Sequence, residues 1–222
     1  MVKRLYSDAG TGFFIVLKGK VEVEHRVLTT GVYYFSVKKQ AETVKLYANT
    51  RLAGIRFLPA IGYGVVGKMP EAITELNSND TKWKPLFQLK QSLLSDQFID
   101  CQLDTIQRWV EQNLALIQTL PSSVSQVLEQ MNLDTPIGQL VKRVCISQRQ
   151  LERQFQVWLD MTPKYFQRII RVRVTVEYLK QYPNANMAGI AHQFGFSDQS
   201  HMIREFRQIA GISPRQIMGH NS

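Results

Sequence analysis

The sequence predicts an α+β protein in which a β-rich N-terminal part precedes a helical linker and an all-helical C-terminal part. Three observations carry this prediction. The first 68 residues contain short β-branched and aromatic runs separated by glycines, apolar residues then recur at helical spacing from Trp83, and the C-terminal part repeats a helical motif. We therefore expect three regions, over residues 1–82, 83–130 and 131–222.

Four segments of the N-terminal region have the composition of strands. They are the apolar run Phe13–Leu17, the alternating run Val21–Glu24, the aromatic run Val32–Val37 and the run Leu52–Leu58, which Pro59 closes. Turn signals recur around them at Gly10, Gly12, Gly19, Gly31, Gly62 and Gly64. This spacing predicts a small β-barrel or sandwich.

Apolar residues spaced three or four apart continue from Leu86 to Leu114, and glycine becomes rare after Trp83. The pattern predicts about two helices, which Pro121 stops, followed by a short helix over Val124–Met131. The apolar stripe of the first two helices fits packing on the β-rich part, and it equally fits pairing with a second subunit.

The C-terminal part contains one motif written twice. Residues Leu151–Pro163 read LERQFQVWLDMTP and residues Met202–Pro214 read MIREFRQIAGISP, an offset of 51, whereas Leu140 matches Ile190 at an offset of 50. One residue is therefore inserted in the turn of the second copy. Each copy has the plan of a helix-turn-helix, and two such units in tandem favour a protein that reads duplex DNA.

In the first copy, Ser147 is a good N-cap for the second helix, and Leu151 and Phe155 are four residues apart on its inner face. Three residues of the outer face are candidates for contact with DNA: Arg149, Glu152 and Arg153. Arginine pairs specifically with guanine, but each exposed arginine fits a solvated or phosphate-bound side chain equally well. The stalk of Arg153 can also support the core.

In the second copy, Gly195 ends the first helix with a positive φ, and Ser197 or Asp198 caps the next. Met202 and Phe206 point inward, and the outward candidates are Gln199, Ser200, Ile203 and Arg204. A glutamine amide suits adenine and an isoleucine suits the thymine methyl, although ordinary polar surface explains Gln199 and Ser200 as well.

Pro163–Gln181 is expected to form the helix that joins the two copies, with the proline at its first position. About 18 residues give a rod of roughly 27 Å. Successive major-groove faces on one side of B-DNA lie about 34 Å apart. A monomer could thus place both recognition helices in adjacent major grooves.

The chain carries 27 Lys and Arg against 18 Asp and Glu, with basic and acidic counts of 13 and 7 in residues 1–85, 2 and 5 in 86–130, and 12 and 6 in 131–222. The basic C-terminal part fits a polyanion, whereas the spread-out N-terminal charge is typical of a solvated surface. Cys101 and Cys145 fit no metal or redox spacing and are expected in the core of a cytoplasmic protein. The longest apolar run is too short to span a membrane.

Residues 133–218 resemble the DNA-binding domain of AraC-type transcription regulators. The motifs that carry the resemblance are Ser147-x-Arg149-x-Leu151-x-Arg153-x-Phe155, Thr162-Pro163, Arg171, Ile190-Ala191, the run Gly195–His201, Arg204-x-Phe206 and Gly211-x-Ser213-Pro214. Val141, Cys145 and Asp160 depart from the family's small residues. By motif position, the resemblance implies DNA contacts at Arg149, Glu152, Arg153, Gln199, Ser200, Ile203 and Arg204.

In the N-terminal region, Gly54–Phe57 followed by Gly62–Gly64 resembles the reduced cupin-like sensor domain of one AraC-type subgroup. The resemblance implies promoter DNA and RNA polymerase as partners, with a small-molecule effector and a homodimer as candidates. Because there is no His-x-His motif or carboxylate cluster and His25 stands alone, we expect no metal. We also expect no cofactor and no enzyme activity. Two rivals stay open: a ligand-binding or enzymatic β-domain with a DNA-binding tail, and a non-specific architectural protein.

Overall fold

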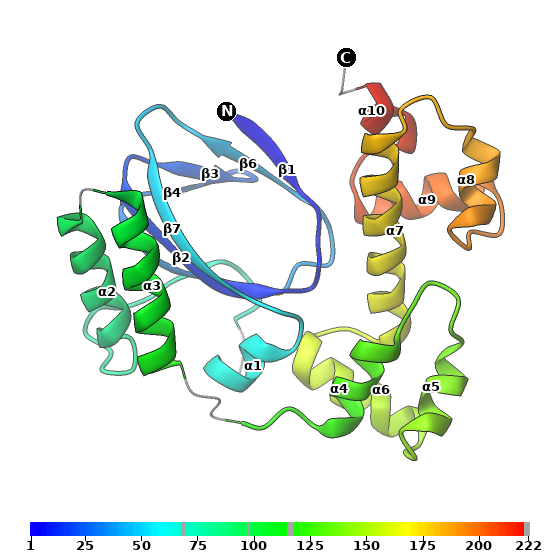
Figure 1. Cartoon of the computed structure of the whole chain (residues 1–222), viewed down its shortest axis with the longest axis horizontal. Helices are drawn as coiled ribbons and strands as arrows, with labels where there is room; N and C mark the ends of the chain where they lie inside the picture. The colour runs from blue at the N-terminus through cyan, green and yellow to red at the C-terminus, as the bar shows by residue number, and fades with distance from the viewer. Residues whose placement is uncertain (68–69, 97, 115–117, 220–222) are drawn as a thin grey trace. The chain divides into compact units, whose positions relative to one another are not determined.

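Residues 1–67, 70–96, 98–114 and 118–219 are described by the computed structural model, shown as a ribbon in Figure 1. The chain divides into two units. The N-terminal unit comprises residues 1–4, 10–37 and 43–119, and the C-terminal unit comprises residues 5–9, 38–42 and 120–222. The predicted α+β class is confirmed, while the predicted limits of the three regions remain a proposal.

The strands form two four-stranded sheets, one in the order β1-β6-β3-β4 and the other in the order β7-β2-β5-β8. The first sheet contains β1 (Val2–Leu5), β3 (Val21–Val23), β4 (Arg26–Leu28) and β6 (Glu42–Leu46). The second contains β2 (Thr11–Lys18), β5 (Gly31–Phe35), β7 (Arg51–Phe57) and β8 (Thr74–Glu75). Strand β2 lies at the centre of its sheet because it is apolar on both faces, and it pairs antiparallel with β5 and β7.

The core of the N-terminal unit is aromatic. The ring of Phe13 packs edge-on against the rings of Tyr34, Phe57 and Trp83, with centroids 5.8, 5.5 and 5.6 Å apart. These rings fill the interior of the β-structure. The aromatic runs of the sequence therefore supply core packing.

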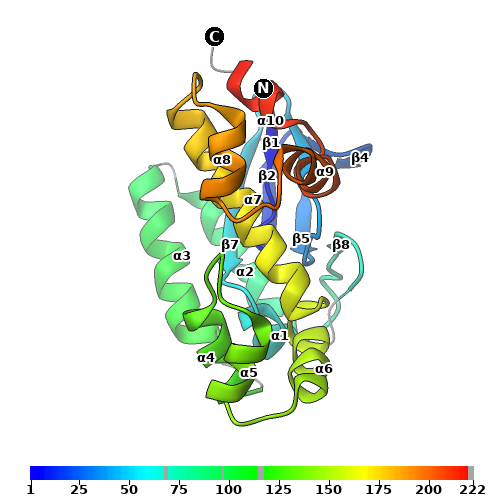
Figure 2. The same ribbon diagram turned by 90° about the vertical axis from the view of Figure 1, so that its right-hand side faces the viewer.

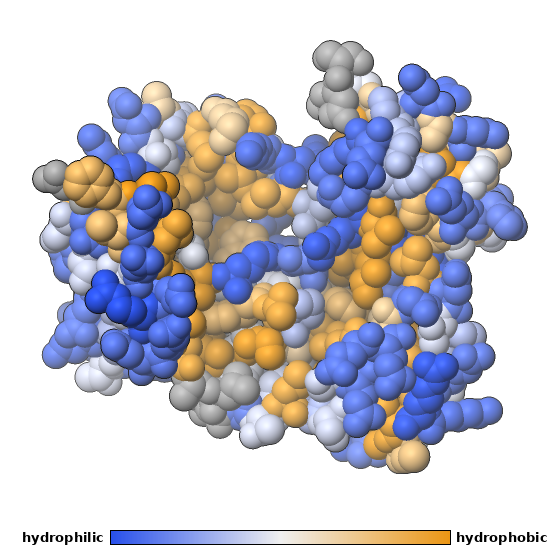
Figure 3. All heavy atoms as spheres, in the orientation of Figure 1, coloured by the Kyte–Doolittle hydropathy of each residue, from blue (hydrophilic) through white to orange (hydrophobic). Residues whose placement is uncertain are grey.

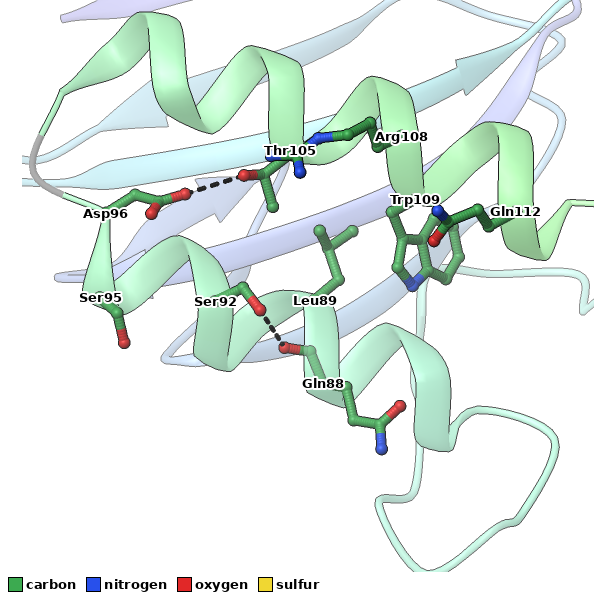
Figure 4. Close-up of a pocket in the computed structure, with 9 residues that line it drawn as sticks. All are labelled: Gln88, Leu89, Ser92, Ser95, Asp96, Thr105, Arg108, Trp109 and Gln112. Atoms are coloured by element: carbon green, nitrogen blue, oxygen red, sulfur yellow. Dashed lines mark hydrogen bonds between the residues drawn. The ribbon is translucent and has the colours of Figure 1, made fainter.

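Two helices cover this core, α2 (Lys84–Ser95) and α3 (Ile99–Asn113). Leu86, Leu89 and Leu93 of α2 are buried against the strands, so the apolar stripe of α2 packs on the β-structure. The indole N–H of Trp109 donates to the backbone oxygen of Pro85 at 2.9 Å and ties α3 to α2. A polar groove of about 500 Å³ runs between these helices, where Asp96 accepts a hydrogen bond from Thr105 (Figure 4).

Two expectations for this unit are wrong. The Gly62–Gly64 segment lies inside a short helix, α1 (Ile61–Val66), because Gly62 packs so closely on Thr11 that a Cβ would lie 1.8 Å from the Thr11 hydroxyl. Cys101 is exposed on α3, and Cys145 is exposed in the C-terminal unit, so neither cysteine belongs to a core.

The C-terminal unit is built around the long helix α7 (Pro163–Gln181). Helices α4 (Ser122–Gln130), α5 (Ile137–Arg143) and α6 (Gln148–Leu159) gather at one end of α7 (Figures 1 and 2). Helices α8 (Met187–Gln193), α9 (Gln199–Ile209) and α10 (Pro214–Gly219) gather at the other end.

Two short segments from early in the chain belong to the C-terminal unit. The backbone N–H of Ala41 donates to the carbonyl of Ile209 at the end of α9, at 2.7 Å. The ammonium group of Lys39 lies 3.0 Å from the carboxylate of Asp160, in the turn between α6 and α7. Residues 38–42 thus contact the rest of the C-terminal unit at two places.

Among the described residues, no helix is both long enough and apolar enough to cross a membrane.

Candidate nucleic-acid interface

The first helix-turn-helix consists of α5, a turn over residues 144–147, and α6. The hydroxyl of Ser147 accepts the backbone N–H of Gln150 at 3.2 Å, which confirms the predicted N-cap. Leu140, Leu151 and Phe155 are fully buried where the two helices cross. The turn requires a left-handed residue, and Cys145 occupies that position with φ 54°.

The second helix-turn-helix consists of α8, the turn over residues 194–198, and α9. Gly195 occupies the left-handed position with φ 70°, as the sequence predicts. The N-cap is Asp198, whose carboxylate accepts the backbone N–H of His201 at 2.7 Å. That hydrogen bond is the main reason why the pKa of Asp198 lies below its usual range, with smaller contributions from Ser197 and Arg204.

His201 holds the turn rather than pointing outward as a free ligand. Its ring nitrogen Nδ1 accepts the backbone N–H of Ser197 at 3.1 Å, and its Nε2 lies 3.7 Å from the carboxylate of Glu205. Both ring nitrogens therefore face groups of the protein. Among the described residues, no group of three or more His, Cys, Asp or Glu side chains could hold a metal ion.

The structure places all seven candidate DNA-contacting residues on the two recognition helices. In α6, Arg149 and Arg153 are exposed one turn apart, and half-buried Glu152 accepts a hydrogen bond from Gln148 at 2.9 Å. In α9, the fully buried side chains are Met202 and Phe206. The four candidates of α9 lie elsewhere on the helix, with Ser200 and Arg204 exposed and Gln199 and Ile203 half-buried.

Helix α7 is pinned to the entry of the first helix-turn-helix by two side chains. The amide nitrogen of Gln167 donates to the carbonyls of Asn132 and Thr135, both at 2.8 Å, and Gln167 is almost fully buried. One turn further on, the guanidinium of Arg171 donates to the carbonyl of Leu133 at 2.9 Å. Together these hydrogen bonds hold the loop before α5 against the rod.

The same helix is pinned to the second helix-turn-helix. The guanidinium of Arg171 lies over the ring of Phe196, with its central carbon 5.6 Å from the centroid. Arg168 forms an ion pair with Glu205 of α9 at 2.7 Å, and Glu205 is only 8% exposed. Arg171 therefore contacts the loop before the first helix-turn-helix and the turn of the second.

Sequence reasoning missed this set of attachments. Gln167 and Glu205 occupy positions where a helical pattern predicts nothing unusual, and Arg168 reads as ordinary polar surface. Only the partners of these side chains, which lie 32 to 38 residues away in the chain, reveal their role.

The length of α7 sets the span between the two helix-turn-helix units. Helix α7 has 19 residues, which gives about 28 Å at 1.5 Å per residue. Helix α6 directly precedes α7 in the chain, and α9 follows it after α8, so the width of each helix-turn-helix unit adds to this span.

The comparison with known proteins agrees with this geometry. The family described as "Helix-turn-helix domain" matches residues 140–219. Residues 140–219 of this chain thus form a helix-turn-helix domain. The domain resembles the HTH-type transcriptional regulator ArgR of Pseudomonas aeruginosa, at 28% identity over 92 residues, and the regulator GbdR of the same species, at 33% over 90 residues. Each match covers 40% of this chain, and 28% and 24% of the two relatives respectively.

Among solved structures, ToxT from Vibrio cholerae shares the fold over almost the whole chain. One crystal form has a TM-score of 0.53 at 10% identity and covers 99% of this chain and 97% of ToxT. A second ToxT structure has a TM-score of 0.52 at 10% identity and covers 100% and 98%. The fold of this chain, with its N-terminal β-structure and C-terminal helices, is thus shared with ToxT.

Proposed function

We propose that this protein is a sequence-specific DNA-binding transcription regulator. The observation that carries the proposal is the attachment of two capped helix-turn-helix units to a single 19-residue rod. Since side chains of α7 bind both units, the two recognition helices are held at a set distance. Such an arrangement suits two adjacent major grooves on one side of B-DNA.

Seven residues are proposed to contact DNA: Arg149, Glu152 and Arg153 in α6, and Gln199, Ser200, Ile203 and Arg204 in α9. Exposed arginines near a helix N-terminus are suited to guanine edges, and Gln199 is suited to adenine. Glu152 can accept from cytosine N4 once Gln148 releases it.

The division of labour is part of the proposal. Residues 131–222 bind promoter DNA, and residues 1–82, covered by α2 and α3, regulate that binding and perform no chemistry. RNA polymerase is the proposed partner at the promoter. One of the similar ToxT structures is bound to (E)-4-(8-methylnaphthalen-1-yl)but-3-enoic acid. By analogy, we propose a small apolar molecule as effector of the N-terminal unit.

We also propose that the protein pairs with a second copy through α3. Ile99 and Leu103 lie one turn apart on α3, and the stripe continues at helical spacing into Ile106 and Val110, which pack against the core of the N-terminal unit. Ile99 is 72% exposed and Leu103 is 59% exposed, and the neighbouring Phe98 is 72% exposed. Figure 3 shows apolar side chains at the surface where α2 meets α3. A twofold axis would pair this stripe with itself.

The specificity ratio tests the proposed function. The full chain is first used to select its preferred sites from genomic fragments. Its affinity for the selected site is then compared with its affinity for a scrambled duplex of equal length, at physiological salt. A regulator should prefer its site by at least about 10³-fold. Equal affinity for both duplexes would instead identify an architectural protein.

A further inference from the structure

The N-terminal unit carries a second concentration of positive charge, separate from the helix-turn-helix units. Four exposed cations, Lys18, Lys20, Lys45 and Arg51, belong to it, and two of them, Lys20 and Lys45, lie over the ring of Tyr47. We refer to these five residues as the Lys18–Arg51 patch. The sequence suggests cations spread over solvated strands, but the fold brings these four together.

Sheet register and turns bring the patch together. Lys18 and Arg51 are directly paired across β2 and β7, next to a bulge in β2. The hydroxyl of Thr50 donates to the carbonyl of Lys20 at 2.9 Å, which joins the β2–β3 turn to the segment before β7. Gly19 makes this approach possible, because with φ 78° it takes a left-handed conformation beside Thr50.

Tyr47 gathers two of the lysines. The ammonium groups of Lys20 and Lys45 lie 4.3 and 4.9 Å from its ring centroid. Both distances are within the range of cation–π attraction. The ring therefore concentrates charge that would otherwise repel.

The patch has little acidic compensation. The ion pairs of the described residues include none that involves Lys18, Lys20 or Arg51. Among the described residues, Glu22 is the acidic residue that contacts members of the patch. It already accepts the Tyr47 hydroxyl at 2.6 Å, and it lies 4.0 Å from Lys45. Three cations are thus available to an anionic partner.

The chemistry of the patch favours phosphates. It consists of long cationic side chains at the ends of β2, β6 and β7 and in the β2–β3 turn, and none of the strongly exposed large apolar residues of the described chain lies in residues 18–20 or 45–51. A membrane-binding surface would place apolar side chains beside its lysines. Duplex DNA, by contrast, presents one negative charge per about 1.7 Å and needs only cations within reach.

We propose that the Lys18–Arg51 patch binds the phosphate backbone of DNA that flanks the site read by the two helix-turn-helix units. This inference rests on the proposed function, because binding by the C-terminal unit keeps the patch near flanking DNA. Tethering raises the effective concentration of flanking phosphates to about the millimolar range, so contacts that are weak alone contribute to total affinity.

The test compares salt dependence on two duplexes with the full chain. The short duplex contains only the selected site of about two helical turns, and the long one adds 20 base pairs of random sequence on each side. The patch variant K18Q/K20Q/R51Q removes three charges. The control K84Q/K90Q/R108Q removes three charges from α2 and α3 of the same unit.

Each lost phosphate contact lowers the slope of log K against log salt by about 0.9. On the long duplex, the slope of the patch variant should therefore be shallower by up to about 2.7. Between 50 and 200 mM salt, the wild type should then lose up to about forty-fold more affinity than the patch variant. On the short duplex, wild type, patch variant and control should have one slope.

Several outcomes would overturn the proposal. The first is a patch variant whose salt slope on the long duplex equals that of the wild type. The second is a control variant whose slope on the long duplex falls as much as that of the patch variant. The third is a patch variant whose slope falls as much on the short duplex as on the long one. An acidic protein as the true partner would give the first of these results. Failure of the proposed function gives a different result, because the wild type would then show no preference for the selected site. In that case, the salt slopes of wild type and patch variant on long random duplexes would still test the patch.

Discussion

The left-handed turn residues of the two helix-turn-helix units differ, and exchanging them gives a quantitative prediction. Gly195 has φ 70° and Cys145 has φ 54°. An L residue in this region costs about 1–2 kcal/mol, whereas glycine pays no such cost. The first unit should therefore carry a strain that the second avoids.

Gly195→Ala should destabilise the second unit by about 1–2 kcal/mol. The new Cβ would lie 2.7 Å from the Asp134 carboxylate, but Asp134 is exposed and can move away, so this contact adds little. Cys145→Gly should stabilise the first unit by up to about 1 kcal/mol, because glycine's greater freedom in the unfolded chain offsets part of the relief. Cys145→Ala is the matched control, since it removes the thiol and keeps the left-handed strain.

Amide hydrogen exchange, resolved by peptides, measures the opening of each unit separately. Gly195→Ala should raise exchange in α8 and α9 by about 5–30-fold. Cys145→Gly should lower exchange in α5 and α6, and Cys145→Ala should change it little. The reasoning is refuted if Cys145→Ala protects the first unit as well as Cys145→Gly does, or if Gly195→Ala leaves α8 and α9 unchanged.

The remaining predictions concern binding, pairing and pH. Arg153→Ala or Arg204→Ala should each weaken binding to the selected site by about 1–3 kcal/mol in a gel-shift titration, and unchanged affinity in both, with native circular dichroism, would remove them from the interface. Arg171→Met should weaken binding to a full site more than to either half-site, because it detaches Leu133 from the rod; equal losses would exclude a positioning role. Leu103→Asp should raise the dimer dissociation constant at least about ten-fold in sedimentation experiments, and an unchanged constant would exclude pairing through α3. Because its folded-state pKa is lowered, Asp198 stabilises α9 above its unfolded-state pKa, and this stabilisation is lost as pH falls through the folded value; exchange in α9 should therefore rise in wild type only in acid, and the Asn variant should lack this rise.

The C-terminal helices could be predicted well because their signals are local. Caps, spacing and proline predict α7 over Pro163–Gln181, and the structure has the same limits. The N-cap at Ser147 and the left-handed conformations of Asp160 and Gly195 also depend on neighbouring residues alone. Local chemistry of this kind is readable from one sequence.

The rest depends on contacts between distant parts of the chain. Strands β1, β4 and β6 are short and carry charged residues, and pairing with β3 or with each other defines them rather than composition. The helix at Gly62 depends on its close approach to Thr11. Cys145 was expected in a core because its neighbours are apolar, yet its left-handed backbone directs it to the exposed turn. The seven candidate contacts with DNA stay predictions.

The length of helix α7 sets the distance between the two recognition helices, and this limits which changes of sequence the protein can tolerate. A substitution in α7 that preserves its buried face does not alter the distance between the two recognition helices. A single inserted residue, however, would advance one reader by about 1.5 Å and turn it by about 100° around the rod. When the first recognition helix lies in one major groove, the second would then face away from the adjacent major groove. Under the proposed function, substitutions in α6 and α9 can therefore change the DNA sequence that is recognised, while the length of α7 is constrained by the helical repeat of DNA.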